Sequence, residues 1–150
     1  MTETCVDLPG LLSMRSLGDK IAAELEPGDV IALSGPLGSG KTTLARATIA
    51  ALGYTTEVPS PTFTIIETYE PPAIRLPVVH ADFYRLSSRE EAMEIGLDDY
   101  RAEAVLIAEW PDRIGGFDND ERALSIALET VGSGRRAVVT PGKAWLRRWP

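Results

Sequence analysis

The sequence has little of the chemistry on which disulfide scaffolds and zinc sites depend. It contains one cysteine, Cys5, and one histidine, His80, so an internal disulfide is excluded and a typical zinc site cannot be assembled. No run of about 18 or more apolar residues occurs, and Glu3 and Asp7 stand where a secretory signal would be basic and then apolar. These absences favour a cytoplasmic protein without a membrane segment.

Positive charge is also scarce. Lys and Arg number 15 against 22 Asp and Glu, a net charge of −7, which disfavours unaided binding to a polyanion such as RNA. A hydrophobic content of 44% in 150 residues suits one ordinary core and leaves no length for a second domain or a large lid. We therefore expect residues 1–150 to form a single domain, with any nucleic acid held by another component.

Residues 35–42, Gly-Pro-Leu-Gly-Ser-Gly-Lys-Thr, match every position of the phosphate-binding loop pattern G-x-x-x-x-G-K-[ST]. The apolar run 29–34 before the loop predicts a buried parallel strand, and residues at helical spacing follow it up to Gly53. This context is the one the motif requires, because the glycines let backbone N–H groups approach phosphate oxygens at the start of a helix. The sequence therefore predicts a nucleoside triphosphate site.

The residue types of the loop suggest their contacts. The nucleotide is expected to touch Gly35, Leu37, Gly38, Ser39 and Gly40. Lys41 is expected to reach the β- and γ-phosphates, and the Thr42 hydroxyl to hold Mg²⁺. Thr43 either touches a phosphate or merely caps and packs the first helical turn.

Two apolar runs end in a carboxylate, residues 78–82 at Asp82 and residues 105–109 at Glu109. Ligands of open α/β sheets bind beyond the carboxyl ends of the strands, so both acids are expected to face the Mg²⁺ of a bound nucleotide. Either acid alone is equally well interpreted as a solvated residue at a strand end. The segment Ser60-Pro61-Thr62 suits a switch loop that senses the γ-phosphate through Thr62, although the same tripeptide is common in turns.

Helical patterns flank these motifs. Ser16 and Asp19 resemble a capping box and open an apolar stripe that ends at Leu25. Ser88 is expected to cap a short helix that stops before Gly96. The tail 145–149 is expected to form a short docking helix.

Strand-like patterns cover residues 63–69, 76–82, 104–108, 124–128 and 136–140. The last two runs are separated by Gly132-Ser133-Gly134, which predicts an antiparallel pair, and we expect that pair at a sheet edge.

Taken in order, the motifs resemble the bacterial TsaE (YjeE) family. Besides the loop, the matching stretches are Ser60-Pro61-Thr62-Phe63, His80-x-Asp82-x-Tyr84-Arg85-Leu86, Gly96-Leu97-x-Asp99-Tyr100 and Glu109-Trp110-Pro111-x-Arg113. The resemblance runs from about residue 17 to residue 113. Pro36 and Ala108 depart from the usual residues of the family, and neither departure removes a polar group that the mechanism requires.

The resemblance implies a P-loop NTPase fold, a three-layer α/β/α arrangement whose central parallel sheet is flanked by antiparallel strands. It implies ATP or ADP with Mg²⁺, and a role as the ATPase component of tRNA threonylcarbamoyladenosine synthesis. In that pathway the partner proteins TsaB and TsaD transfer a threonylcarbamoyl group to adenosine 37 of tRNAs that read ANN codons.

Carried over by matching position, Lys41 contacts phosphates, Thr42 binds the metal, and Asp82 is the Walker-B-like acid. Glu109 acts near Mg²⁺ or the attacking water, and Trp110 lies by the nucleotide base. The catalytic group then comprises Lys41, Asp82, Glu109 and Thr62, and the metal group Thr42, Asp82 and Glu109. For Trp110 a core anchor is the alternative, and the single histidine is interpreted as a structural hydrogen-bonding residue.

Other functions stay open at this stage. A small-molecule kinase is the main alternative, but no Arg-rich lid segment follows Glu109. A GTPase is disfavoured because the sole asparagine, Asn119, is not part of an N-K-x-D motif. A nucleotide-gated module without turnover also remains. Arg85 and Arg113 are expected to pair with carboxylates, such as the run 90–91 for Arg85, so we expect no internal arginine to complete the site and slow turnover without partners.

Overall fold

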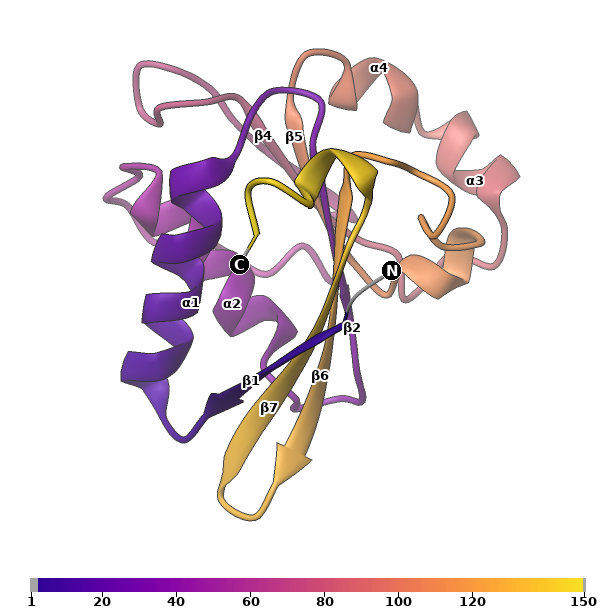
Figure 1. Cartoon of the computed structure of the whole chain (residues 1–150). Helices are drawn as coiled ribbons and strands as arrows, with labels where there is room; N and C mark the ends of the chain where they lie inside the picture. The colour runs from indigo at the N-terminus through magenta and orange to yellow at the C-terminus, as the bar shows by residue number, and fades with distance from the viewer. Residues whose placement is uncertain (1–2, 150) are drawn as a thin grey trace.

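A seven-stranded mixed sheet forms the centre of the molecule, in the order β1-β7-β6-β2-β5-β4-β3 (Figure 1). The structure is a computed structural model that describes residues 3–149. Its strands are β1 Thr4–Leu8, β2 Val30–Ser34, β3 Ile66–Tyr69, β4 Val78–Asp82, β5 Val105–Glu109, β6 Ala123–Val131 and β7 Gly134–Pro141. Strands β6, β2, β5 and β4 are parallel neighbours, with antiparallel β7 and β1 on one side and antiparallel β3 on the other. The expected parallel centre with antiparallel flanks is confirmed.

Helices cover both faces of this sheet (Figure 1). The helices are α1 Leu11–Glu24, α2 Lys41–Ala51, α3 Arg89–Glu94 and α4 Leu97–Arg101, with 3-10 turns η1 Pro111–Ile114 and η2 Lys143–Trp145. One apolar core lies under α1 and α2, and a second lies under α3, α4 and η1. Within residues 3–149, no helix has the length and hydropathy that crossing a bilayer demands.

The central strands are buried on both faces, as their unbroken apolar runs predict. Every residue of β4 and β5 is buried, and in β2 only the last residue, Ser34, is partly exposed. Parallel strands end at one edge of a sheet, so β2, β4 and β5 deliver the residues that follow or finish them to one place. Those residues are the phosphate-loop motif after Ser34, together with Asp82 and Glu109.

Helix α1 begins earlier than the sequence suggested. It starts at Leu11, because the hydroxyl of Ser13 turns back and donates to the carbonyl oxygen of Gly10 at 2.7 Å, while the Gly10 N–H donates to the same hydroxyl at 3.1 Å. Ser16 lies inside the helix, so the capping box assigned to it was wrong. For α3 the expectation is confirmed, since the Ser88 hydroxyl accepts from the Glu91 N–H.

The hairpin of β6 and β7 is present but does not lie at the sheet edge. Strand β6 lies between β7 and β2, and the edge is taken by β1, which pairs with β7. The edge prediction failed because β1 has only five residues, Thr-Cys-Val-Asp-Leu, a pattern too short to be detected.

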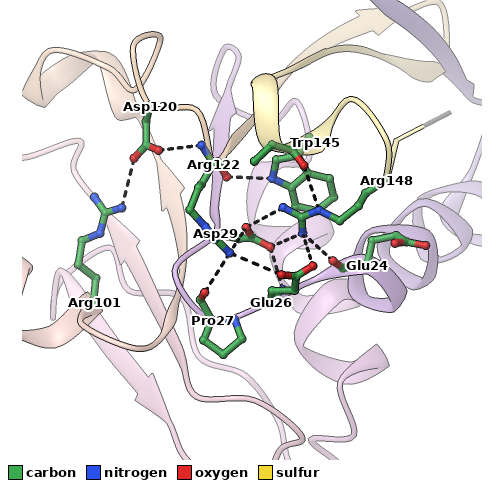
Figure 2. Close-up of polar contacts among 10 residues, drawn as sticks. Glu24, Glu26, Pro27, Asp29, Arg101, Asp120, Arg122, Trp145 and Arg148 are labelled. Atoms are coloured by element: carbon green, nitrogen blue, oxygen red, sulfur yellow. Dashed lines mark hydrogen bonds and ion pairs between the residues drawn. The ribbon is translucent and has the colours of Figure 1, made fainter.

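The C-terminal tail is fastened to the amino end of β2 (Figure 2). The Arg148 guanidinium holds the Asp29 carboxylate through two hydrogen bonds of 2.6 and 3.0 Å, and Arg122 adds a third of 3.0 Å. The indole N–H of Trp145 donates to the carbonyl oxygen of Arg122 at 2.9 Å. The tail thus docks as expected, although its helical part is only the short turn η2.

Candidate functional site

A cavity of about 430 Å³ opens at the carboxyl ends of the parallel strands, within the size range of small-molecule and nucleotide sites. Ten of the residues predicted for the site line it: Leu37, Gly38, Gly40, Lys41, Thr42, Thr43, Thr62, Asp82, Glu109 and Trp110. Gly35 and Ser39 are absent from the lining. Segments separated by more than 60 residues therefore converge on one cavity.

Two loop positions admit only glycine. At Gly35 the backbone φ is +140°, and a Cβ there would lie 2.5 Å from the carbonyl oxygen of Leu128. At Gly40, which caps α2, φ is +104° and a Cβ would lie 2.9 Å from the terminal methyl of Met14. The tight approach of the loop to β6 and α1 therefore depends on these glycines.

Lys41 is the cation of the loop, and its side chain is folded back on it. Its Nζ donates to the carbonyl oxygens of Gly35 at 2.7 Å and Pro36 at 2.9 Å, and the residue is only 5% exposed. Burial lowers the pKa of Lys41 below its ordinary value, and the charges of Glu109 and Asp82 oppose that shift. The ammonium is thus poorly solvated and held by neutral carbonyls, which suits exchange for an anionic ligand.

Trp110 lies against this ammonium. Lys41 Nζ is 4.2 Å from the centroid of the Trp110 indole. The Tyr84 ring packs against the same indole, with 4.9 Å between the ring centroids. Trp110 has a φ of +55°, a left-handed conformation that is uncommon for a bulky residue. Its ring is therefore held at the lysine and carboxylate end of the cavity, and its contact with a base stays a prediction.

Glu109 is fixed through both carboxylate oxygens. The Thr42 hydroxyl donates to Oε1 at 2.8 Å, and His80 Nε2 lies 2.7 Å from Oε2. His80 is fully buried and Glu109 is 2% exposed. The sequence interpretation of His80 as a hydrogen-bonding residue matches this geometry.

Asp82 lies beside Glu109. The two acids are register partners on β4 and β5. Asp82 Oδ1 accepts from the Tyr84 N–H at 3.0 Å, and Oδ2 accepts from the Thr62 hydroxyl at 3.3 Å. Two like charges placed opposite each other cost stability, so this pair is a specialised arrangement that a cation would stabilise. Thr62 is brought to the acids as the sequence suggested, while its role as a sensor stays a prediction.

The donors at this end suit a hard cation. The Thr42 hydroxyl donates its hydrogen bond to Glu109, so the lone pairs of its oxygen remain available to a cation. Asp82 adds a carboxylate to the same cavity. Among residues 3–149, no group of three or more His, Cys, Asp and Glu could hold a metal ion unaided. Mg²⁺ typically binds through one or two protein oxygens together with phosphate and water, so these residues fit it as part of a metal–nucleotide complex.

Arginines are placed differently from the expectation. The Arg85 guanidinium lies 4.6 Å from the Phe63 ring centroid, and that of Arg113 lies 4.7 Å from the Tyr84 ring. No ion pair of either residue with a carboxylate occurs in the described part of the chain, so the expected pairing was wrong. One arginine that sequence reasoning did not consider, Arg135, lines the cavity.

One wall of the cavity was not predicted from the sequence. It comprises Leu8, Pro9, Gly10, Leu11 and Met14 around the β1–α1 turn, and Ser133, Gly134 and Arg135 at the β6–β7 turn. These segments carry no motif and reach the loop only through tertiary packing. Strand β1 leads directly into the β1–α1 segment, but its short pattern is not recognisable in the sequence. Nothing in the sequence therefore indicated this wall.

The fold and the site define an α/β protein whose ligand cavity lies at the carboxyl ends of parallel strands, beside a glycine-rich loop that opens a helix. More particularly, the chain belongs to the TsaE family, because the family model described as Threonylcarbamoyl adenosine biosynthesis protein TsaE matches residues 9–138.

Individual relatives agree with the family match. The chain is 43% identical over 138 residues to the tRNA threonylcarbamoyladenosine biosynthesis protein TsaE of Streptomyces coelicolor, covering 88% of this chain and 93% of the relative. It is 38% identical over 125 residues to the protein of the same name from Bacillus subtilis, covering 83% and 76%. A crystal structure of Bacillus subtilis YdiB superposes with a TM-score of 0.78 at 27% identity, covering 98% of this chain and 91% of that one.

Proposed function

We propose that this protein is a P-loop ATPase that serves the threonylcarbamoylation of adenosine 37 in tRNAs that read ANN codons. It binds ATP or ADP with Mg²⁺ in the cavity described above. It acts in the cytoplasm together with TsaB and TsaD. Family membership supports the pathway, and the site supports the nucleotide chemistry.

One observation carries the ATPase proposal. The Thr42 hydroxyl, at the start of the helix that the loop opens, is hydrogen-bonded to Glu109 at the end of β5. This contact joins the residue expected to bind the metal to the acid expected to act on water. A loop match alone predicts phosphate binding, whereas this junction supports hydrolysis.

The residues have separable tasks. Lys41 leaves the carbonyl oxygens of Gly35 and Pro36 and donates to the β- and γ-phosphate oxygens, where its charge is better satisfied. Glu109, held by His80 and Thr42, accepts a hydrogen bond from the attacking water and orients it. Thr42 and Asp82 are the residues that would hold Mg²⁺, which supplies positive charge to the phosphates when bound.

Partners are expected to contribute to turnover. A missing arginine finger lowers phosphoryl-transfer rates by roughly 10³ to 10⁵, and Arg85 and Arg113 are engaged with aromatic rings. We therefore expect slow hydrolysis by the isolated chain and faster hydrolysis with TsaB and TsaD. The net charge of −7 disfavours direct tRNA binding, so tRNA is contacted through the complex.

The test incubates pure protein with γ-labelled ATP, alone and with TsaB and TsaD. Released phosphate that increases with the partners supports the proposal. A labelled small molecule would identify a kinase, and tight binding without turnover would identify a nucleotide-gated module. Fast hydrolysis that ignores the partners would contradict the assigned role.

Variants locate the activity in this cavity. Lys41→Ala should weaken nucleotide binding about 10- to 100-fold, since a charge-assisted hydrogen bond contributes about 1.5–3 kcal/mol. Glu109→Gln should lower the hydrolysis rate about 100-fold or more with little loss of binding. The matched controls are the exposed residues Lys143→Ala and Glu129→Gln, which should behave as the parent protein. Parent rates in both site variants would refute the assignment.

A further inference from the structure

Residues 53–65 lie between α2 and β3 and carry Thr62, the residue expected to sense the γ-phosphate. This stretch contains no helix or strand, and only the side chains of Val58 and Pro61 are buried in it. Within residues 3–149, the backbone of residues 55–60 makes no hydrogen bond to another backbone group. The position of Thr62 therefore depends on a small number of contacts on either side of it.

On the C-terminal side, Thr62 is followed by a backbone anchor at Ile65. The Asp82 N–H donates to the carbonyl oxygen of Ile65 at 2.9 Å, and the Ile65 N–H donates to that of Pro61 at 2.8 Å. Ile65 has a φ of +69°, a left-handed conformation that is uncommon for a β-branched residue. This side of the segment is thus tied to β4, the strand that ends in Asp82.

On the N-terminal side, the anchor is a side chain of the helix that the phosphate loop opens. Arg46 Nε donates to the carbonyl oxygen of Val58 at 2.9 Å. Among residues 3–149, no other hydrogen bond joins residues 55–59 to the rest of the chain. The Val58 side chain, 6% exposed, packs into the apolar core under α1 and α2. Without Arg46, apolar contact alone would hold this part of the segment.

Arg46 has no direct access to the site. It lies four residues after Thr42 and on the same face of α2, but its side chain is exposed and does not line the cavity. An effect of Arg46 on hydrolysis would therefore be transmitted by the segment that it holds.

The contact that this segment delivers is sensitive to small displacements. The Thr62 hydroxyl donates to Asp82 Oδ2 at 3.3 Å, and its oxygen lies 2.7 Å from the Ser60 hydroxyl oxygen. A separation of 3.3 Å is long for a hydrogen bond between oxygen atoms. A shift of a few tenths of an ångström would break it, so restraint of the segment matters for this contact.

We propose that Arg46 is a positioning residue for hydrolysis, whose bond to the Val58 carbonyl keeps Thr62 on Asp82. The inference rests on the proposed ATPase function and adds to it a residue outside the cavity. Thr62 and Asp82 belong to the catalytic group, whereas nucleotide affinity depends mainly on the loop and Lys41. Loss of the Arg46 bond should therefore slow turnover with little change in affinity.

The experiment measures kcat with γ-labelled ATP, which detects slow hydrolysis, and the ADP dissociation constant by calorimetry. Arg46→Ala should lower kcat about fivefold, the size of one lost hydrogen bond, and change the ADP dissociation constant less than about twofold. Arg46→Lys keeps a donor and should recover most of the rate. The matched control is Arg15→Ala, an exposed arginine of α1 that does not line the cavity, which should behave as the parent protein.

A double-mutant cycle tests whether Arg46 acts through Thr62. Thr62→Ala should lower kcat by itself. Addition of Arg46→Ala to Thr62→Ala should lower kcat no further, because two residues that act through one contact are not additive.

Four results would overturn the inference. They are a parent kcat in Arg46→Ala, equal losses of kcat and ADP affinity in that variant, a parent kcat in Thr62→Ala, and additive losses in the double variant. Failure of the proposed function is distinguishable, because the parent protein would then release no phosphate from ATP.

Discussion

His80 and Glu109, on the neighbouring strands β4 and β5, are joined by a buried contact of 2.7 Å between His80 Nε2 and Glu109 Oε2. The side chains are 0% and 3% exposed, so water cannot replace this partner. With Thr42 on the other oxygen, the carboxylate has little rotational freedom. His80 is therefore expected to act on turnover through Glu109 and without touching the nucleotide.

We predict that His80→Ala lowers the ATP hydrolysis rate about 10- to 100-fold, the usual cost of removing a group that orients a ligand residue. ADP affinity should change less than twofold, because the phosphates do not contact His80. His80→Gln keeps a donor on a side chain of similar reach and should recover most of the rate. The check is a comparison of kcat with the ADP dissociation constant; equal losses in both, or no rescue by glutamine, would contradict a positioning role.

The contact of Lys41 with Trp110 predicts a fluorescence signal that reports phosphate. When the ammonium leaves the indole for phosphate oxygens, the local field at the ring changes. Tripolyphosphate and ADP should therefore both alter the emission, while adenosine should not. Trp110→Phe should abolish the change, since Trp145 and Trp149 do not line the cavity. A response to adenosine alone would instead put the ring against the base.

The contact between Asp29 and Arg148 predicts that the tail contributes to the free energy of unfolding (Figure 2). Asp29 is fully buried and Arg148 has a side chain 13% exposed, and removal of one partner of a buried pair costs about 3–5 kcal/mol. Arg122 still serves Asp29, so we expect Arg148→Ala to lower the free energy of unfolding by about 2 kcal/mol. Urea titration measures this loss, and the exposed neighbour variant Arg147→Ala should show none.

The site was predictable where its signals were local. Lys41 and Thr42 belong to a contiguous motif, and Asp82 and Glu109 each finish an apolar run, so strand direction was enough to bring them together. The contact between His80 and Glu109 required knowledge that β4 and β5 are adjacent. Sequence reasoning could assign hydrogen bonding to the histidine but not its partner.

The cavity wall formed by the β1–α1 and β6–β7 turns shows why the rest was not predictable. Met14 and Arg135 are more than 100 residues apart in sequence, and neither lies in a motif. Their proximity depends on β1 joining β7 at the sheet edge. A strand of only five residues gains its stability from this tertiary pairing rather than from local preference, so its pattern carries almost no signal.

The raised pKa of Tyr69 predicts that the protein loses stability at alkaline pH. Burial, aided by the charge of Glu67, raises the pKa of Tyr69 from 10.0 to about 12. The folded state therefore retains the proton that the unfolded state releases, so this contribution is intact below pH 10.0 and is lost as the pH rises to about 12. Tyr69→Phe should remove the loss, as pH-dependent thermal unfolding would show.

The same variant should be more stable at neutral pH. The Tyr69 hydroxyl is buried without a hydrogen-bond partner among the described residues, and such a group costs about 1–3 kcal/mol. We expect a gain of about 1 kcal/mol in Tyr69→Phe, with Tyr54→Phe, whose ring packs edge-on at 4.7 Å, as the control. A clear loss of stability would show that the hydroxyl is satisfied.

Among the described strands, β1 pairs with β7 alone, and its last residue, Leu8, lines the cavity together with Pro9. Attachment of this strand and occupancy of the cavity are therefore linked equilibria. A ligand resting on Leu8 adds its binding free energy to the pairing of β1 with β7. Conversely, detachment of β1 from β7 removes Leu8 and Pro9 from the cavity wall and weakens ligand binding. The stability of this edge strand therefore affects the affinity of the cavity for its ligand.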